Sequence, residues 1–154
     1  VAVIGVLFVG GGTLLAGVEA ALEAIPDNSD CHKAIQFARS QTASASGGAV
    51  IRERYQHLNV VHTVNNLALV IWALLRHPDD FSAAIGDVVA EGLDTDCNGA
   101  TVGALWALQG KAIPRHWLAP WDDAVGVSLA GQAVLNLEDL VTRTLAVEVS
   151  LRTS

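Results

Sequence analysis

The chain has 154 residues, of which 51% are apolar and 16% are charged, and its formal net charge is −7. This length suffices for one sizeable core, so we expect residues 1–154 to form one domain or part of a larger one. The acidic balance argues against a nucleic-acid-binding protein, which needs a basic surface to displace counterions from phosphates. Arg52 and Arg54 are too few to provide one.

The two cysteines bear on the cellular setting of the protein, and the start of the chain bears on whether the polypeptide is longer. Cys31 and Cys97 form no spacing motif, and one pair is too little for a disulfide framework, so we expect a reducing, cytoplasmic setting. The sequence contains no methionine and starts at Val1, which we interpret as a piece of a longer polypeptide. The mean hydropathy of +0.40 leaves room for an apolar surface through which the chain binds a copy of itself.

The first eighteen residues are uncharged, a length near the lower limit for a membrane span. The glycine triplet at 10–12 interrupts this run and no basic flank sets an orientation, so we favour a segment that does not enter a membrane. Thr13 is a candidate N-cap for a helix over 14–25, where apolar residues recur three and four positions apart.

The same periodicity predicts a helix over 31–40, with Ser29 or Asp30 as its cap, and a short charged helix over 50–56. The small-residue stretch between them is either a loop or a tightly packed helix end. A helix that starts at His62 or Thr63 is apolar nearly all round, which favours a central position.

Pro78 is expected at the first position of the next helix, with Asp79 and Asp80 in its first turn. This helix ends at Gly92, directly before the hexapeptide DTDCNG.

Two carboxylates one residue apart, Asp94 and Asp96, open that hexapeptide. Side chains two residues apart on a continuous helix point to nearly opposite sides, so the pair can share a ligand only from a turn or an unwound first turn. Converging hard oxygens suit Mg²⁺, Ca²⁺ or Mn²⁺. The alternative is that one of the two carboxylates caps the following helix, which runs to Gly110. The spacing alone leaves both interpretations open.

Two other metal sites are excluded. The hexapeptide matches the first half of an EF-hand loop, but the loop should end in a bidentate Glu where this chain has Leu105. The histidines show no zinc spacing, since His57 and His62 fall on different faces of a helix.

The end of the chain predicts a tryptophan-bearing turn at 117–121 and two more helices, the last with Asn136 as cap three residues before Asp139. No segment alternates with the strand period of two over any length. We therefore predict an all-α protein, a compact multi-helix array.

The run HTVNNLALVIWALL, then DDFSAAIGDVVAEGLDTDCNGATVGALWALQG, then AIPRHW, resembles the C-terminal part of the ADP-ribosylglycohydrolase family. The likeness covers about residues 50–145 and, more loosely, the first helices. It rests on a DxD turn after a glycine, a small-residue helix with Gly103, and an Ile-Pro followed by a Trp. It implies an all-α array of the ADP-ribosylglycohydrolase type. It also implies hydrolysis of the glycosidic bond between ADP-ribose and a protein side chain or a small molecule, with two Mg²⁺ ions.

The resemblance implies that Asp94 and Asp96 are metal ligands that act in catalysis through Mg²⁺, with Mn²⁺ as a substitute. The family commonly has Thr or Ser directly after the second Asp, where this chain has Cys97. A thiol is a soft, poor partner for Mg²⁺, so the third ligand, Cys97 or Thr95, stays open.

His62 and Asn65 lie in an HTxxN stretch that the resemblance places near the site, which makes them candidate substrate-binding residues. The alternative is that this histidine and the amides of Asn65 and Asn66 are helix-start or buried hydrogen-bonding groups. The four tryptophans are likewise candidates for stacking on an adenine, although aromatic side chains in an apolar helix array are more often core.

Family members also carry a Thr-Asp-Asp type cluster near their N-terminus, which this chain lacks. The pairs Asp79-Asp80 and Asp122-Asp123 lie outside the family's motif positions, at expected helix starts, so we interpret them as capping or solvated pairs. We therefore expect half of a two-metal site, in the C-terminal part of a domain whose N-terminal part is a necessary partner. Such a chain is expected to be inactive alone.

Two other functions stay open: a non-catalytic, crystallin-like member of the same fold, and a small helical interaction domain. The sequence does not choose among ADP-ribosyl-arginine, ADP-ribosyl-serine, a free ADP-ribose derivative or another nucleoside-like glycoside as the substrate.

Overall fold

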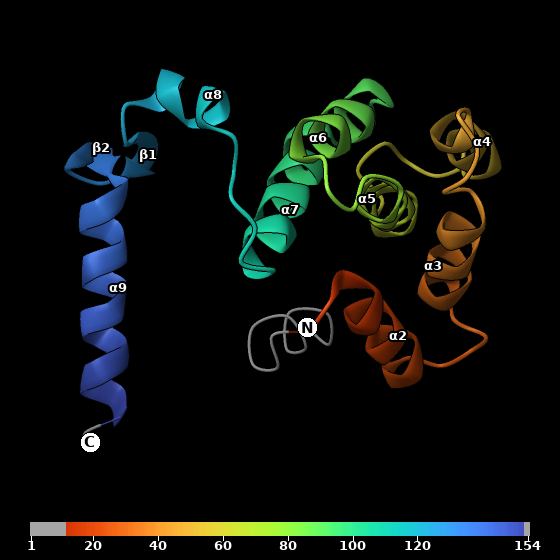
Figure 1. Cartoon of the computed structure of the whole chain (residues 1–154), viewed down its shortest axis with the longest axis horizontal. Coiled ribbons are helices and arrows are strands. Elements are labelled where there is room, and N and C mark those ends of the chain that lie inside the picture. The colour runs from red at the N-terminus through yellow and green to blue at the C-terminus, as the bar shows by residue number, and fades with distance from the viewer. Residues whose placement is uncertain (1–11, 153–154) are drawn as a thin grey trace. The chain divides into compact units, whose positions relative to one another are not determined.

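The structure, a computed structural model, describes residues 12–152. Contacts divide the chain into two units, Val1–Ala112 and Ile113–Ser154, and each is described by itself. The first unit contains α2 (Leu14–Ala24), α3 (Asp30–Ser40), α4 (Gly47–Arg54), α5 (Thr63–Arg76), α6 (Phe81–Ala90) and α7 (Thr95–Leu108) (Figure 1). The second contains α8 (Arg115–Leu118), the 3-10 helix η1 (Ala119–Trp121), strands β1 (Ala124–Leu129) and β2 (Gln132–Asn136), and α9 (Leu137–Arg152). The predicted all-α multi-helix class is confirmed, apart from this small hairpin.

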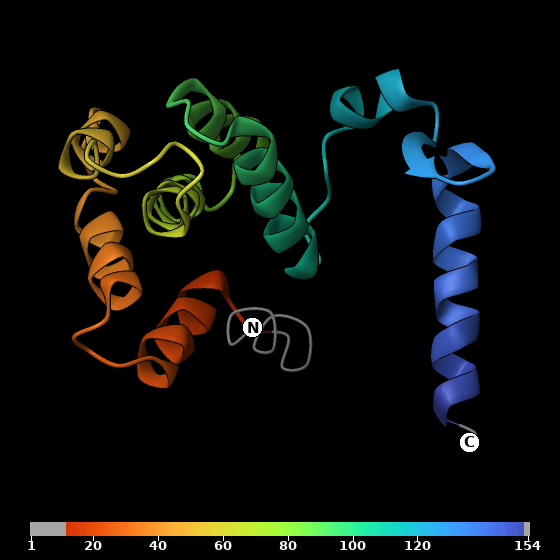
Figure 2. The same ribbon diagram turned by 180° about the vertical axis from the view of Figure 1, so that it is seen from behind.

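Helix α5 forms the centre of the first unit, as its all-round apolar sequence predicts. It packs against α3, α4, α6 and α7, and both views show it between α3 and α4 on one side and α6 and α7 on the other (Figures 1 and 2). Its side chains Leu69, Trp72 and Leu74 are at most 1% exposed. Because α5 touches both α6 and α7, it supports the turn that joins them.

Local capping chemistry sets several helix starts. Thr13 accepts a hydrogen bond from the backbone of Ala16 at 3.2 Å, as predicted for α2. Of the two predicted caps for α3, Ser29 is the one that accepts, from the backbone N–H of His32 at 3.2 Å. These caps satisfy backbone donors that the first turn of a helix leaves without partners.

Two predicted helix starts in the first unit are wrong. Pro78 and Asp79 form a turn, and α6 begins at Phe81, because the Asp80 side chain accepts from the backbone N–H of Ala83 at 3.0 Å and so acts as the cap. Helix α4 begins at Gly47 instead of residue 50. The interpretation of the Asp79-Asp80 pair holds, since Asp79 is exposed and pairs with Lys111 at 3.0 Å.

The second unit corrects the prediction of two helices after residue 121. The strands β1 and β2 pair antiparallel, with Val125 opposite Leu135, and turn at Gly131, whose φ of +76° suits glycine. Both strands are largely exposed, so neither has a buried face. The sequence therefore shows no long alternation of apolar and polar residues here. The predicted cap of the last helix is confirmed, because the Asn136 side chain accepts from the backbone N–H of Asp139 at 3.1 Å.

Asp122 and Asp123 do not start a helix either. Their φ values of 45° and 53° are left-handed, and the two residues form the turn that leads into β1. The tryptophans divide between the units: Trp72 and Trp106 are core residues at 1% and 4% exposure, while Trp121 is 61% exposed. The core interpretation is therefore right only in the first unit.

Within residues 12–152 no helix is long and apolar enough to cross a membrane. The prediction that the uncharged segment 1–18 does not enter a membrane concerns mostly residues 1–11, which lie outside the described residues.

Candidate metal centre

The two carboxylates of the hexapeptide lie where α6 passes into α7. Gly92 and Leu93 have φ values of 77° and 64°, two successive left-handed residues that reverse the chain. A left-handed conformation is unfavourable for a leucine, which points to a turn that its surroundings hold in place. Asp94 then occupies the N-cap position of α7 with φ −86° and ψ 72°, and Asp96 lies in the first helical turn. The carboxylates thus come from the turn and the first turn that their spacing requires.

The capping alternative does not describe Asp94. Although Asp94 stands at the N-cap position, its side chain makes no capping hydrogen bond, in contrast to Asp80 at the start of α6. A carboxylate at this position would normally accept from a backbone N–H two or three residues on. The Asp94 carboxylate is therefore not used to cap α7.

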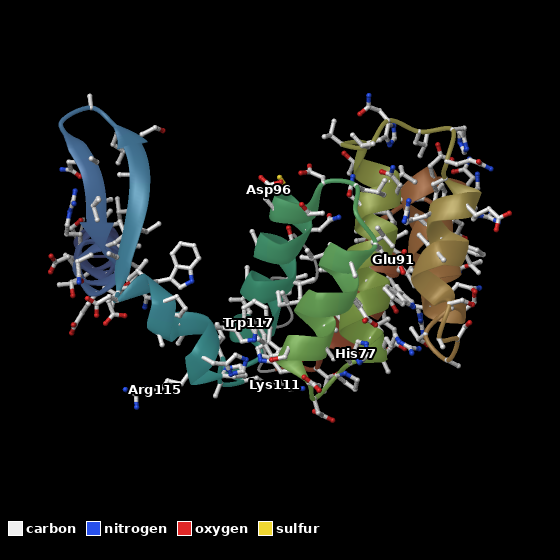
Figure 3. The ribbon with its side chains drawn as sticks, turned by 90° about the horizontal axis from the view of Figure 1, so that it is seen from above. His77, Glu91, Asp96, Lys111, Arg115 and Trp117 are labelled. Atoms are coloured by element: carbon white, nitrogen blue, oxygen red, sulfur yellow. The ribbon has the colours of Figure 1, made fainter. Side chains whose placement is uncertain are left out.

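Asp94, Asp96 and Cys97 each offer one ligand atom, and these three atoms lie within 4.8 Å of one another. Across residues 12–152 this is the one such group of three or more His, Cys, Asp or Glu side chains. Two ligand atoms on one Mg²⁺ ion are at most about 4.2 Å apart, so the separation of these atoms is close to what a single bound ion requires. Figure 3 shows Asp96 at the end of α7 where this helix begins.

The carboxylates act on the thiol. A hydrogen bond to Asp94, the negative charge of Asp94, partial desolvation and the charge of Asp96 together raise the pKa of Cys97. A raised pKa keeps the thiol neutral, because a thiolate here would add a third negative charge. A bound cation would offset the same negative charges.

Asn66 connects this turn to the start of α5. Its side-chain oxygen accepts hydrogen bonds from the backbone N–H of Asp94 at 3.2 Å and from the Asn98 amide at 2.7 Å. Its own amide donates to the carbonyl oxygens of Val60 and His62 at 2.8 and 2.9 Å. Asn66 and Asn98 are 9% and 3% exposed, so these hydrogen bonds are protected from water. Asn66 thereby fixes the backbone position from which the Asp94 carboxylate projects.

The candidate substrate residues His62 and Asn65 both have structural partners. His62 caps α5, since its Nδ1 accepts from the backbone N–H of Val64 at 3.2 Å. Asn65 is 1% exposed and donates to the carbonyl oxygen of Asn59 at 3.0 Å. The helix-start and buried-hydrogen-bond interpretation of these residues is confirmed, and their role toward a substrate stays a prediction.

A shallow hollow of about 270 Å³ lies beside Asp94 and Cys97, and Asp96 is not among its lining residues. It is lined by Val61, Thr63, Asn66, Leu67, Val70, Asp94, Cys97, Asn98 and Thr101. This volume is below the usual range for a complete small-molecule pocket, about 300–1,000 Å³. Thr95, the other candidate for third ligand, is the first residue of α7 and does not line the hollow.

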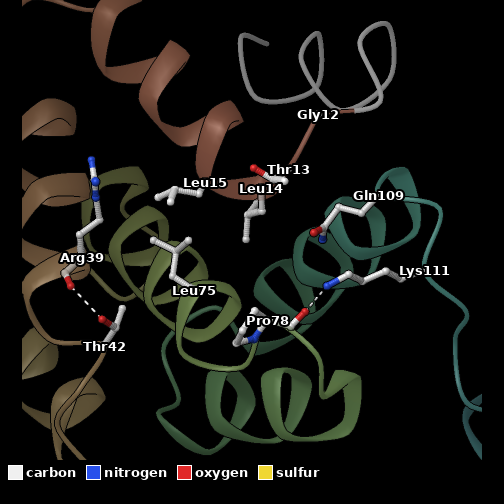
Figure 4. A pocket seen from close by; sticks show the side chains of 10 residues that line it. All are labelled: Gly12, Thr13, Leu14, Leu15, Arg39, Thr42, Leu75, Pro78, Gln109 and Lys111. Atoms are coloured by element: carbon white, nitrogen blue, oxygen red, sulfur yellow. Dashed lines mark hydrogen bonds between the residues drawn. The ribbon is translucent and has the colours of Figure 1, made fainter.

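A larger hollow of about 700 Å³ lies at the other end of α5, where Leu75, Pro78 and Lys111 form part of its wall (Figure 4). Thr63 and Leu75 are near opposite ends of a 14-residue helix about 20 Å long. None of the candidate metal ligands lines this hollow. Its larger volume would make this hollow the first candidate for a binding site. The candidate metal ligands Asp94 and Cys97, however, line the smaller hollow.

Sequence reasoning recognised the acidic pair but did not assign Asn66 to the site. Its partners Asp94 and Asn98 are 28 and 32 positions away, which no local pattern connects. The sequence offered one indication of this role, the adjacent amides Asn65 and Asn66 in an otherwise apolar helix. Amides buried in such a helix need hydrogen-bond partners from elsewhere in the fold.

In comparison with protein families, the sequence model of the ADP-ribosylglycohydrolase family matches residues 1–149. Comparison with curated proteins and with solved structures found no match.

Proposed function

Because the chain belongs to the ADP-ribosylglycohydrolase family, we propose that it takes part in metal-dependent hydrolysis of the glycosidic bond of an ADP-ribosyl group. The observation that carries this proposal is the convergence of Asp94 and Asp96 at a turn, with the Asp94 carboxylate not used as a helix cap. We propose Mg²⁺ as the ion, with Mn²⁺ as a substitute, because both accept carboxylate oxygens.

The chain's own residues would hold and orient the ion. Asp94 and Asp96 supply carboxylate oxygens, and Asn66 keeps the Asp94 backbone in position through its hydrogen bond to the N–H. Divalent ions bound at such a centre can orient the ribose hydroxyls and lower the pKa of the water that attacks the anomeric carbon.

We further propose that this chain supplies one side of a two-metal centre. Within the described residues, the Asp-Asp pairs are a cap and its neighbour at 79–80 and a turn at 122–123, and the adjacent Glu138 and Asp139 lie in the first turn of α9. The remaining ligands would then come from an N-terminal part of the same polypeptide. Two carboxylates alone hold Mg²⁺ weakly, so the 154-residue chain should show little Mg²⁺ affinity and release no ADP-ribose.

The test uses the intact parent protein and the 154-residue chain in parallel, with ADP-ribosylated arginine, ADP-ribosylated serine and free ADP-ribose derivatives as substrates. The parent should release ADP-ribose in the presence of Mg²⁺. Asp94→Ala and Asp96→Ala should each lower the rate by at least about a hundredfold, because each removes a direct metal ligand.

Glu23→Ala is the matched control, since Glu23 is an exposed carboxylate in α2 outside the centre. Release of ADP-ribose by the isolated chain would contradict the half-site. A parent that neither hydrolyses these substrates nor binds Mg²⁺ would favour the non-catalytic, crystallin-like alternative.

We also propose a reducing, cytoplasmic setting. Cys31 and Cys97 are both free thiols in the structure, which supports this setting.

A further inference from the structure

A small hollow near the start of α5, which we call the basic hollow, gathers nitrogen donors. Its volume is about 240 Å³, and its wall includes Lys33 from α3, Arg54 from the end of α4, and His57 and His62 from the segment that joins α4 to α5. Among the described residues, Asp30 is the one carboxylate in this wall. In a chain with a formal net charge of −7, such a local gathering of basic side chains is suited to an anion.

The Arg54 guanidinium is positioned by aromatic rings and not by an acid. Its Cζ lies 4.3 Å from the centre of the Phe37 ring and 5.8 Å from that of Tyr55. Within the described residues it has no ion pair or side-chain hydrogen bond, whereas Arg52, on the same helix, pairs with Glu91 at 3.9 Å. The N–H donors of Arg54 are therefore held in place and unused, and a planar guanidinium can bind phosphate oxygens in pairs.

Two histidines add donors to the same wall. The Nδ1 of His62 accepts from the backbone N–H of Val64 at 3.2 Å, so the proton of the neutral ring is on Nε2, which is left as a donor. His57 is exposed and makes no side-chain hydrogen bond within the part of the chain that the structure describes. Lys33 pairs with Asp30 at 3.7 Å, but both side chains are largely exposed, so this ion pair is weak.

The basic hollow and the hollow at the candidate metal centre share one stretch of backbone. His62 and Val64 line the basic hollow, whereas Val61 and Thr63 line the hollow of about 270 Å³ beside the candidate metal ligands. Consecutive residues thus contribute to the two hollows in turn. A single ligand with an anionic group a few bonds away from its reacting carbon could therefore occupy both.

We propose that the basic hollow binds the pyrophosphate of the ADP-ribosyl group whose glycosidic bond reaches the metal centre. The ADP-ribosyl identity of the ligand rests on the proposed function, whereas the binding of a pyrophosphate does not. A volume of about 240 Å³ is below the usual range for a complete small-molecule pocket, about 300–1,000 Å³. It suits the phosphate groups alone, with the sugars and the adenine outside.

The test measures binding to the 154-residue chain by isothermal titration calorimetry. Metal-free buffer is used so that no ion bridges the ligand to Asp94 and Asp96. Inorganic pyrophosphate, ADP and ADP-ribose should each bind with one-to-one stoichiometry, and adenosine, which has no phosphate, should not bind. Higher ionic strength should weaken the binding of all three, because the contacts join opposite charges.

Arg54→Gln should weaken the binding of these three ligands by about tenfold to a hundredfold, because it removes charge-assisted hydrogen bonds. Arg52→Gln is the matched control. It makes the same change of charge on the same helix, but Arg52 pairs with Glu91 and does not line the basic hollow. Its affinity should change by less than about twofold, since exposed charges at a distance are screened.

Asp30→Asn should act in the opposite direction. It removes the carboxylate from the wall and releases Lys33 from its ion pair, so affinity should rise by about twofold to tenfold. A gain in affinity cannot result from a damaged fold.

No binding of the three phosphate ligands, equal affinities of Arg54→Gln and Arg52→Gln, or adenosine that binds as tightly as ADP would each overturn the proposal. Pyrophosphate that binds while ADP-ribose does not would also overturn it, because the hollow would then exclude the substrate.

The parent protein separates this inference from the proposed function. Arg54→Gln should raise KM by at least about tenfold and change kcat by less than about twofold, because the pyrophosphate is held alike in the substrate and the transition state. Hydrolysis with an unchanged KM in Arg54→Gln would refute this inference alone. Binding of ADP-ribose that depends on Arg54, in a parent protein that hydrolyses no ADP-ribosyl bond, would refute the proposed function alone.

Discussion

At Asp94 the backbone and the side chain have separate tasks. The backbone N–H donates to Asn66, and the carbonyl oxygen accepts from the backbone of Asn98 at 2.9 Å, which begins the hydrogen-bond ladder of α7. The carboxylate makes no cap hydrogen bond and lies beside the Cys97 thiol. A residue that only started the helix would not need this separation, because a cap uses its side chain on the backbone.

The raised pKa of Cys97 leads to a prediction about its reactivity. Only the thiolate is alkylated rapidly, so with metal removed by chelation the alkylation rate of Cys97 should rise at a higher pH than for an ordinary thiol. Asp94→Asn removes the carboxylate whose hydrogen bond and negative charge contribute most to the raised pKa of Cys97. The substitution should therefore lower the pKa of Cys97 and move its alkylation-rate profile to lower pH. Alkylation by iodoacetamide, measured by peptide mass spectrometry across pH, checks this.

The Cys31 peptide from the same samples is the internal control, and its profile should not move with Asp94→Asn. A Cys97 profile that is the same in both proteins would show that Asp94 does not govern the thiol.

At the scale of elements, the start of α5 and the start of α7 form one hydrogen-bonded assembly through Asn66. The segment before α5 contributes the carbonyl oxygens of Val60 and His62, and the turn before α7 contributes the N–H of Asp94 and the amide of Asn98. The position of the candidate ligands therefore depends on a helix that carries none of them.

Asn66→Ala should destabilise the chain by about 2–4 kcal/mol, because it leaves several protected polar groups without partners, each at a cost of about 1–3 kcal/mol before relaxation. Urea unfolding followed by circular dichroism measures this. Asn28→Ala is the control, since Asn28 is exposed and its replacement should change the free energy of unfolding by less than about 0.5 kcal/mol. Equal stabilities of the two variants would mean that Asn66 is not a structural link.

Elements with local signals were predictable from the sequence, and elements fixed by distant partners were not. The caps Thr13 and Ser29 and the buried helix α5 follow from side-chain chemistry and periodicity within one segment. The hairpin at 124–136 has exposed strands that are held mainly by their own pairing, so it lacks the alternation that burial imposes. Pro78 satisfied the rule for a first helical residue, but the cap two residues later, Asp80, decided where α6 begins.

The same contrast applies to the candidate centre. The spacing of Asp94 and Asp96 already required a turn, and the structure supplies it with the left-handed residues Gly92 and Leu93. Spacing did not choose between a cap and a metal ligand, because both use the same position. The structure shows that the Asp94 side chain makes no capping hydrogen bond, and its role as a metal ligand stays a proposal.

At the scale of the whole molecule, the two units differ in how much they bury. The apolar core lies in the first unit, and none of the described residues 113–152 is buried. Several large apolar side chains of the second unit are exposed, among them Leu145 at 58% and Leu151 at 73%. A segment of this size without buried side chains has little to stabilise it alone, which makes it the expected site of local opening.

Limited proteolysis should therefore cut the second unit first. Trypsin at a low ratio should cleave after Arg115 and Arg143 faster than after Arg39 and Arg76, because proteolysis in the native state requires local opening and Arg76 follows a fully packed stretch of α5. A time course by mass spectrometry gives the order of cleavage, and the same digestion in urea should remove the difference. Cleavage of all four sites at similar rates under native conditions would contradict the expected difference in local stability. Protection of the sites after Arg115 and Arg143 that is lost on dilution would instead indicate that the exposed apolar side chains of the second unit bind a second copy of the chain.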